Sequence, residues 1–426
     1  MDTIFARATP PGRSGVAIIR ISGPRALEVP SLFETAPISP RKPALRTLRQ
    51  DGAILDEALL LAFSDGQSFT GEPVLEIQCH GSIAVVNALL TRLETFEGLR
   101  PAEAGEFTRR ALQNERLDLP QVEALADLID AETEMQRQQA LRGVSGQFSA
   151  QAEGWRSQLI RAAALLEATI DFADEEVPVD VTPEVLGILT SLQSDFQAAI
   201  AAVPFAERVR QGFEVAIVGA PNVGKSTLLN ALAGREAALT SEIAGTTRDV
   251  VEVRMDLGGL PVTLLDTAGV REGQDPVERA GITLARKRAE GADLRIFLGP
   301  PPDGMQPDLE DILAHPKADV DNLDDKLSIS GKTGLGLDAL IATIQARLSA
   351  RQPVDPGATH SRHATAIRRA RAALESAQTR LEYGNDFPEL AAQDMREALL
   401  SLDGLLGRIG VEDLLGEIFS SFCIGK

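Results

Sequence analysis

This sequence of 426 residues is poor in the features that mark secreted, zinc-binding or membrane proteins. Its two cysteines, Cys79 and Cys423, lie far apart, which argues against a disulfide framework or zinc site and favours a reducing compartment. No apolar run approaches the ~18 residues of a membrane span. The first residues also lack a basic flank followed by an apolar stretch. We therefore expect a cytoplasmic protein without a membrane segment.

Positive charge is also scarce. The chain has 42 Lys and Arg residues against 62 Asp and Glu residues, a formal net charge of -20. This balance argues against a protein whose whole surface binds phosphate backbones, so any RNA contact should be local or shared with a partner. The 44% content of hydrophobic residues indicates a globular chain, long enough for roughly two to four domains.

Four stretches differ in their hydrophobic pattern. Residues 1–118 mix helices with short strands such as 16–21 and 74–78, which are bounded by Gly and Pro. Residues 119–210 have apolar side chains at helical spacing, for example Val122, Leu125 and Ile129. We expect an α/β domain followed by a helical segment.

The second half of the chain changes pattern twice. Strands and helices alternate over residues 211–348, as in a mostly parallel sheet. Residues 349–426 begin with a linker and become helical, with Ile367, Ala370 and Leu374 on one face. The predicted fold class is α/β plus α, with a helical domain made of two segments and an α/β domain inserted between them.

A phosphate-binding loop opens the inserted domain. Residues 219–226 fit the pattern G-x-x-x-x-G-K-[ST], with an apolar strand before them and a helix after them. Gly219 and Gly224 allow backbone N–H groups to surround phosphates at the helix N-terminus. Lys225 is expected to reach the β- and γ-phosphates and Ser226 to bind Mg²⁺.

Two further motifs follow in the order that nucleotide hydrolysis requires. Residues 266–269, Asp-Thr-Ala-Gly, come after a strand, where Asp266 can hold Mg²⁺ through water and the Gly269 N–H can meet the γ-phosphate. Residues 245–249 include Thr246 and Thr247, one of which could complete the Mg²⁺ shell. Together with the phosphate loop, these motifs predict a nucleoside triphosphatase.

The segment that reads the base departs from the usual N-K-x-D pattern. Residues 316–319 are Pro-Lys-Ala-Asp, so Lys317 can cover a base and Asp319 can read its Watson–Crick edge, while Pro316 replaces the asparagine. Residues 330–332, Ser-Gly-Lys, resemble the loop that offers N–H groups to guanine O6. We favour guanine over adenine, with reduced affinity.

The sequence resembles the MnmE (TrmE) family of tRNA-modification GTPases from end to end. The combination of a phosphate loop with a terminal C-I-G-K is highly specific. The matching motifs are residues 8–13, 20–23, 69–72, 105–108, 219–226, 243–249, 266–272 and 422–426.

The resemblance implies an architecture and a partner. It implies a tetrahydrofolate-binding-like N-terminal domain that forms a homodimer, a helical domain and a Ras-like G domain. It also implies a heterotetramer with a FAD-dependent protein of the MnmG (GidA) type. The pair is expected to place a (carboxymethyl)aminomethyl-type group on carbon 5 of wobble uridine 34 in certain tRNAs.

The resemblance also assigns roles at the GTP site. It implies that K⁺ is held by Asn222, by the carbonyls of Ser241 and Ile243, and by Thr246, where the cation takes the part of an arginine finger. Thr247 and Ser226 match Mg²⁺ ligands. The nucleotide is expected to contact Asn222, Val223, Gly224, Lys225, Ser226, Thr227, Ser241, Thr246, Thr247, Asp266, Thr267, Ala268, Gly269, Lys317, Asp319, Ser330, Gly331 and Lys332.

Hydrolysis needs an acid that is distant in sequence. Because position 268 is alanine, no glutamine or histidine stands at the usual place beside the γ-phosphate. Glu278 matches the acid that orients the attacking water, alongside Lys225 and Thr247 as catalytic residues. Arg248, Asp249 and Arg271 match residues that order this arrangement.

A second ligand is implied for the N-terminal domain. Arg20, Glu76, Arg116 and Lys426 match positions that bind 5-formyltetrahydrofolate or a related one-carbon folate, although Arg116 stands where the family often has lysine. Cys423 lies three residues before Lys426.

Simpler interpretations stay open beside these assignments. Glu278 can be one more acid of a solvated helix, Arg20 can form a structural ion pair, and Cys423 can be a small core residue. The chain could also be a purely regulatory GTP switch or a ribosome-assembly GTPase. The folate-like motifs argue against the first alternative, and the net charge of -20 argues against the second.

Overall fold

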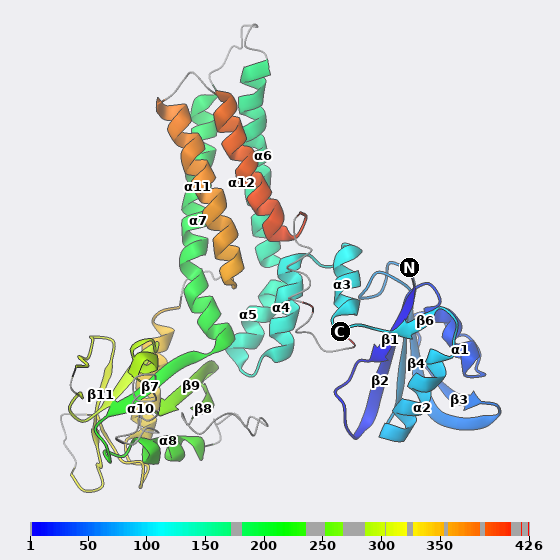
Figure 1. Ribbon diagram of the computed structural model, residues 1–426, viewed down its shortest axis with the longest axis horizontal. Helices are drawn as coiled ribbons and strands as arrows, with labels where there is room; N and C mark the ends of the chain where they lie inside the picture. The colour runs from blue at the N-terminus through cyan, green and yellow to red at the C-terminus, as the bar shows by residue number, and fades with distance from the viewer. Residues whose placement is uncertain are drawn as a thin grey trace, which may run out of the picture. The chain divides into compact units, whose positions relative to one another are not determined.

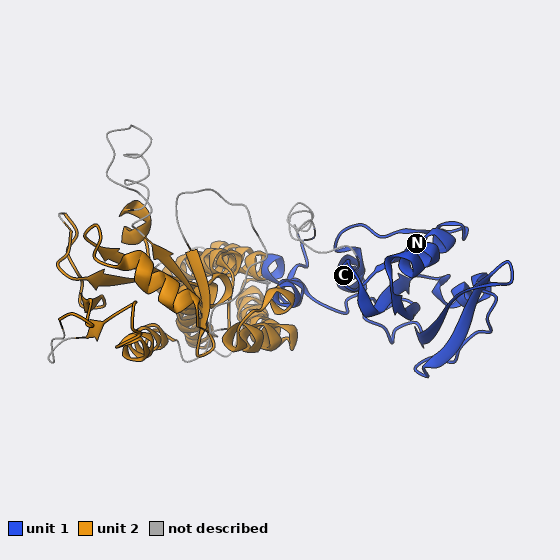
Figure 2. Ribbon diagram, turned by 90° about the horizontal axis from the view of Figure 1, so that it is seen from below, with its two compact units in different colours: residues 1–126, 403–426 blue, residues 127–402 orange. Residues whose placement is uncertain are grey.

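The chain forms two compact units in the computed structural model (Figures 1 and 2). Unit 1 comprises residues 1–126 and 403–426, and unit 2 comprises residues 127–402. Each unit has its own hydrophobic core. The structure describes residues 2–171, 181–235, 252–266, 286–302, 304–321, 327–352, 357–383, 388–409, 419 and 425.

Unit 1 is built on a six-stranded sheet with the order β3-β4-β5-β2-β1-β6. Its strands are β1 (Thr3–Arg7), β2 (Ser14–Ser22), β3 (Ala44–Gln50), β4 (Ala53–Phe63), β5 (Val74–Gly81) and β6 (Leu99–Pro101). Neighbouring strands are antiparallel except β1 and β6, which are parallel. The strands expected at 16–21 and 74–78 are confirmed, since they lie within β2 and β5.

Alternation of side chains gives the sheet two different faces. The helices of unit 1 are η1 (Ala26–Glu28), α1 (Val29–Leu32), α2 (Ile83–Glu94), α3 (Glu106–Gln113) and α4 (Leu119–Asp130), the last of which continues into unit 2. Ile19 and Ile77 pack with Val29 and Leu89, so η1, α1 and α2 cover one face. On the other side of β1, Phe107 of α3 packs with Ile4.

Segments distant in sequence meet inside unit 1. Phe419 packs against Val122 of α4, and both side chains are buried. Gly105 touches Phe419 so closely that an added Cβ would lie 2.8 Å from its Cδ1 atom. Gly425 lies even closer to the carbonyl oxygen of Arg7 at the end of β1, so an added Cβ would not fit there. Phe419 and Gly425 therefore pack against parts of unit 1 that lie about 300 to 420 residues earlier in the sequence.

The helical part of unit 2 consists of long helices that run side by side (Figure 1). They are α5 (Glu134–Val144), α6 (Gln147–Asp171), α7 (Thr182–Gln211), α11 (Ser361–Tyr383) and α12 (Pro388–Leu406). Trp155 is fully packed between Phe148 and Phe196, at ring-centroid distances of 6.2 and 5.1 Å. The predicted apolar face at Ile367 and Leu374 is confirmed as buried.

The second sheet belongs to unit 2 and has the order β12-β11-β10-β7-β9-β8. Its elements are β7 (Phe213–Gly219), β8 (Glu252–Leu257), β9 (Leu260–Asp266), β10 (Leu294–Leu298), β11 (Ile312–Pro316) and β12 (Ser328–Ile329), with α8 (Lys225–Ala233) and α10 (Leu337–Ser349). All strands are parallel except β8, which pairs antiparallel with β9. Such sheets bind ligands beyond the carboxyl ends of the strands.

Both faces of this sheet are covered. Ile217 packs with Leu228 of α8 and Leu340 of α10 on one face, while Val218 packs with Phe297 on the other. Across the described parts of both units, we find no helix with the length and apolarity of a membrane span.

Candidate functional site

The predicted phosphate loop connects β7 to α8. Asn222 and Gly224 have φ values of 60° and 114°, a left-handed conformation that glycine adopts freely and asparagine tolerates. A Cβ on Gly219 would lie 2.7 Å from the carbonyl oxygen of Leu298, so β10 leaves no room for a side chain there. The loop places the N-terminus of α8 at the edge of the sheet where the parallel strands end, and a helix N-terminus at such a position can bind an anion.

Lys225 fills the inside of this loop. Its Nζ donates hydrogen bonds to the carbonyl oxygens of Gly219 at 2.6 Å and Ala220 at 2.9 Å. Burial lowers the pKa of Lys225, an effect that the nearby carboxylate of Asp266 opposes. A buried ammonium group inside a cradle of backbone amides is suited to hold the phosphates of a nucleotide.

A hydroxyl and a carboxylate meet beside the loop. Ser226 Oγ donates to Asp266 Oδ2 at 2.7 Å, joining the start of α8 to the end of β9. Asp266 is buried. Hydroxyl and carboxylate oxygens are the ligand types that Mg²⁺ prefers, so these two side chains fit a Mg²⁺ ion bound with the phosphates.

A cavity of about 230 Å³ opens next to the phosphate loop. Its wall brings together the two segments that the sequence predicted to read a base. The lining residues are Val223, Gly224, Thr227, Leu228, Leu298, Pro316, Lys317, Asp319, Val320, Ile329, Ser330, Gly331 and Lys332. Such a cavity, mostly apolar with a few polar groups, suits a planar base.

The polar end of this cavity is organised around one carboxylate. Ser330 Oγ donates to Asp319 Oδ1 at 2.6 Å, and this hydrogen bond is the main cause that lowers the pKa of Asp319. The backbone N–H groups of Lys332 and Thr333 point at the same Ser330 hydroxyl, at 3.3 and 3.2 Å. Asp319 is thereby held as an ionised acceptor, the form that pairs with the N–H groups of a guanine edge.

Pro316 forms part of the apolar wall. It ends β11 and pairs with Ile329 of β12, while the pairing of β11 with β10 ends two residues earlier, at Ala314. The absent proline N–H therefore interrupts none of the β10–β11 pairs. Ala318 restores the link to β12 by donating to the carbonyl of Ile329 at 3.1 Å. The strand pairing thus accommodates the departure from N-K-x-D.

Part of the predicted site falls outside the described residues, and those assignments stay predictions. They are Ser241, Ile243, Thr246, Thr247, Arg248, Asp249, Thr267, Ala268, Gly269, Arg271, Glu278, Cys423 and Lys426.

In unit 1, the structure pairs two of the predicted folate residues. Arg20 and Glu76 are register partners on β2 and β5, and Arg20 Nε donates to Glu76 Oε1 at 3.0 Å. The guanidinium carbon lies 5.9 Å from the ring centroid of Phe107, and both charged side chains remain partly exposed. Arg116 is exposed, and its Cγ would lie 3.2 Å from a Cβ on Gly71. The pair lies on the sheet face opposite α1 and α2.

A buried charge network beside this pair was missed by the sequence reasoning. Glu72 accepts from Ser22 Oγ at 2.7 Å and from Arg110 at 3.1 Å, and Arg110 also reaches Glu106 at 3.0 Å. Arg100 pairs with Glu106 at 2.6 Å. The sequence did contain one sign of this network, because Glu72 and Glu106 belong to two of the motifs that match the MnmE family.

The network keeps a buried carboxylate ionised. Burial by itself raises the pKa of Glu106, but hydrogen bonds from Arg100, the Glu103 N–H and Arg110 outweigh it, so the pKa is lowered. These contacts join α3, β6 and the segment before β5 into one rigid block next to Arg20 and Glu76.

The geometry of the inserted domain defines the class of protein. It combines three parts of a P-loop GTPase. These are a strand–loop–helix with a buried lysine, a serine–aspartate contact at the end of the neighbouring parallel strand, and a base cavity with an Asp–Ser pair. The chain is a GTP hydrolase of the Ras-like type.

Comparison with known proteins identifies the family. Residues 3–116 match the family model described as the GTP-binding protein TrmE N-terminus, and residues 119–423 match the MnmE helical domain. A tRNA modification GTPase MnmE of Cereibacter sphaeroides is 58% identical over 429 residues, covering 100% of both chains. Proteins of the same name from Ruegeria pomeroyi and Roseobacter denitrificans are 56% and 55% identical over 429 residues, again covering 100% of both chains.

The chain belongs to the MnmE family of tRNA modification GTPases.

Proposed function

We propose that this chain uses GTP hydrolysis to modify tRNA together with a FAD-dependent partner of the MnmG type. The product is a 5-(carboxymethyl)aminomethyl-type group on wobble uridine 34. The observation that carries the proposal is the 58% identity to a relative named for tRNA modification, which extends over the whole of both chains. A shared G domain alone would leave the substrate open, because G domains serve many functions.

Two metal ions belong to the proposed GTP site. Mg²⁺ is held by Ser226 and Thr247, with Asp266 acting through water. K⁺ is bound by Asn222 together with Ser241, Ile243 and Thr246. Support for the K⁺ assignment comes from Asn222, whose φ of 60° marks a special turn of the phosphate loop and whose side chain is exposed. A cation there would offset charge that develops on the transferred phosphoryl group, while Glu278 orients the water.

A one-carbon folate, such as 5-formyltetrahydrofolate, is the proposed ligand of unit 1. Arg20, Glu76, Arg116 and Lys426 are its proposed contacts. In support, the Arg20–Glu76 pair is partly exposed and joined by a hydrogen bond of 3.0 Å, so both a donor and an acceptor are available to a polar ring. The buried network behind it keeps the surrounding backbone fixed.

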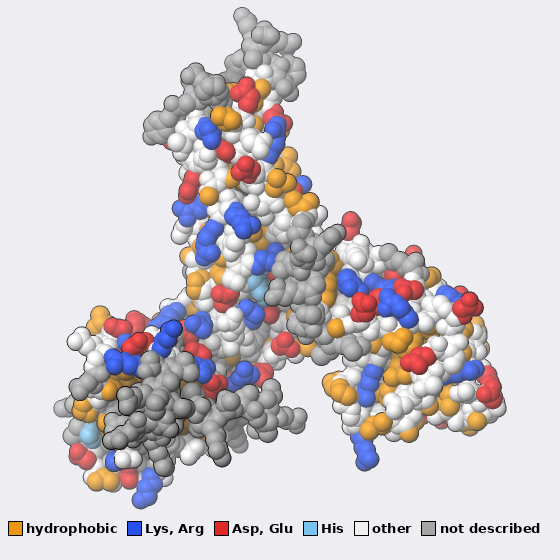
Figure 3. Space-filling model, viewed as in Figure 1, with side chains coloured by type: hydrophobic (Ala, Val, Ile, Leu, Met, Phe, Trp, Pro, Cys, Tyr) orange, Lys and Arg blue, Asp and Glu red, His pale blue; other side chains and the backbone are white. Residues whose placement is uncertain are grey.

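We further propose three domains and a cytoplasmic assembly. Residues 1–118 form the folate-binding-like, dimerising domain, residues 119–210 with 349–426 the helical domain, and residues 211–348 the G domain. Two chains and the MnmG-type partner form a heterotetramer. Acidic and basic side chains intermingle on the face shown in Figure 3, which favours a local tRNA contact shared with the partner.

Nucleoside mass spectrometry of tRNA tests the proposal. A strain lacking this chain should lose the uridine-34 modification, and a plasmid copy should restore it. A Lys225→Ala copy should not restore it, while Lys42→Ala, a change of an exposed lysine in unit 1, should serve as a matched control that does. An unchanged uridine-34 profile in the deletion strain would rule out the proposed tRNA function.

A further inference from the structure

The hairpin of β8 and β9 contacts the helical part of unit 2, and its turn lies against the start of α5. Its turn contains Gly258 and Gly259, with φ values of 64° and 93°. The N–H of Met135, in the first turn of α5, donates to the carbonyl of Gly259 at 3.2 Å. The Met135 side chain packs against the hydrophobic core of the G domain, to which Phe205 and Val209 of α7 also belong. One helix end therefore holds the hairpin through a backbone hydrogen bond and an apolar contact.

The start of α5 is itself held firmly. Gln136 closes a capping box with Thr133, and its Nε2 donates to the carbonyl of Arg210 in the last turn of α7 at 3.0 Å. One turn later, Gln139 Nε2 donates to the carbonyl of Ala206 at 2.9 Å. These bonds satisfy carbonyls near the end of α7 and fix α5 against it. Met135 thus projects from a rigid support.

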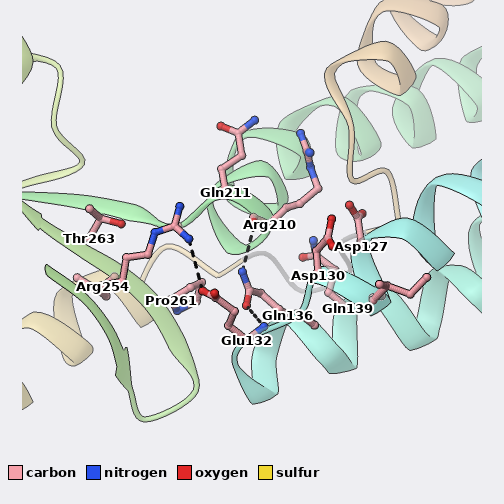
Figure 4. A pocket seen from close by; sticks show the side chains of 15 residues that line it. Asp127, Asp130, Glu132, Gln136, Gln139, Arg210, Gln211, Arg254, Pro261 and Thr263 are labelled. Atoms are coloured by element: carbon pink, nitrogen blue, oxygen red, sulfur yellow. Dashed lines mark hydrogen bonds and ion pairs between the residues drawn. The ribbon is translucent and has the colours of Figure 1, made fainter. Parts of the chain in front are cut away.

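A polar cavity of about 660 Å³ lies beside this contact (Figure 4). Asp130 and Arg210 line it from the helical side, and Thr263 of β9 lines it from the G domain. One ion pair, Arg254 with Glu132 at 3.7 Å, joins the two sides, and both of its side chains are about half exposed. Exposed pairs at this distance contribute little. Next to such a cavity, Met135 is the apolar contact that lies nearest to the hairpin turn, while Phe205 and Val209 of α7 join the same core.

The hairpin leads directly to the catalytic centre. From its turn, β9 runs to Asp266, roughly 20 Å away at the usual rise per residue. The strand is paired on both sides, with β7 and with β8, so it moves as a rigid body. At its far end, Asp266 accepts the hydrogen bond of Ser226. A shift at the turn is therefore transmitted to the proposed Mg²⁺ ligands.

We propose that Met135 is a positioning residue for GTP hydrolysis, acting through the β8–β9 hairpin to hold Asp266 against Ser226. The proposal concerns the GTPase step itself and does not depend on the tRNA or folate assignments.

Steady-state GTP hydrolysis and GDP binding by the full chain test this role. Met135→Ala should lower kcat about tenfold, because a displacement of ~1 Å at a catalytic group is costly. Its affinity for GDP should stay within about twofold, since Lys225 is held by hydrogen bonds to the carbonyl oxygens of Gly219 and Ala220 in its own loop. Met135→Leu, with similar volume, should restore kcat.

Leu141→Ala is the matched control, because Leu141 is an apolar residue of the same helix that is 40% exposed. It should leave kcat unchanged. If Met135→Ala does not fold, Met135→Val provides the smaller truncation. The proposal is overturned if a folded Met135 truncation keeps the wild-type kcat, if GDP affinity falls in parallel with kcat, or if Leu141→Ala causes the same loss.

Discussion

Replacing Arg110 by methionine should destabilise unit 1 and leave unit 2 intact. Arg110 is buried and bridges two buried carboxylates, those of Glu72 and Glu106, and it also pairs with Asp2. Methionine keeps much of the side-chain length but removes the charge and every donor. Arg100 still neutralises Glu106 in the variant, whereas among the described residues Glu72 keeps only neutral donors such as Ser22.

The size of the effect follows from the charge left without a partner. Removing one member of a buried ion pair typically costs about 3–5 kcal/mol. The free energy of unfolding of a whole domain is only about 5–15 kcal/mol. At about 1.4 kcal/mol per factor of ten, protection of unit 1 amides that exchange by unfolding should fall by two to three and a half powers of ten, roughly 10²- to 4 × 10³-fold.

Hydrogen–deuterium exchange measured by mass spectrometry can resolve this, because it reports each unit separately. Peptides from β5 and α3 should exchange faster, while peptides from α6 in unit 2 provide an internal reference. Arg109→Met is the matched control, since Arg109 is partly exposed and pairs with exposed Glu103, a contact worth about 0–1 kcal/mol. Adding Glu72→Gln to Arg110→Met should recover part of the lost protection.

Equal exchange in the Arg110→Met and Arg109→Met variants would refute the reasoning. The buried network would then contribute no more to the free energy of unfolding of unit 1 than a surface ion pair does. A loss that the added Glu72→Gln change does not relieve would also contradict it, because the cost is assigned to the charge of Glu72.

Three further predictions concern the ligands. GTP hydrolysis should be much faster in K⁺ than in Na⁺ at equal ionic strength, and Asn222→Ala should abolish the difference. Equal rates of the unaltered chain in the two salts would contradict the K⁺ assignment. Arg20→Ala or Glu76→Ala should weaken formyl-tetrahydrofolate binding, measured by calorimetry, by about 1.5–3 kcal/mol without slowing GTP hydrolysis. If the unaltered chain does not bind this folate, the proposed folate site is refuted. In competition assays, Asp319→Asn should shift preference from GTP to xanthosine triphosphate, and Pro316→Asn should tighten GTP binding up to roughly tenfold. An unchanged nucleotide ranking in Asp319→Asn would refute base reading by this segment.

Local patterns were sufficient to predict the elements that surround the phosphate loop. An apolar run, two glycines and a helical repeat occur within residues 213–232, so β7, the loop and α8 follow from neighbours in sequence. The same holds for β2 and β5, whose apolar and polar residues alternate. The sequence also predicted that residues 316–319 and 330–332 act together, and the structure brings them to one cavity.

Long-range contacts were beyond this kind of reasoning. Arg110 and Glu72 are 38 residues apart, and nothing in their immediate neighbours indicates that both become buried. Met135 appears in the sequence as an ordinary residue of an amphipathic helix, although its partner in the hairpin lies more than a hundred residues away. Such pairs are set by the tertiary fold, which periodicity does not encode.

The split composition of unit 1 has a consequence for its synthesis on the ribosome. Its sheet lies within residues 3–101, but Phe419 and Gly425, which pack against Gly105 and Arg7, are made about 300 or more residues later. At about 5–20 residues per second, residues 127–402 take roughly 15–55 s to translate. During that interval, the surfaces around Val122 and Gly105 remain uncovered in the newly made N-terminal part of unit 1. Chaperone binding to nascent chains should therefore concentrate on those surfaces, and it should end when the segment after residue 402 leaves the ribosomal exit tunnel.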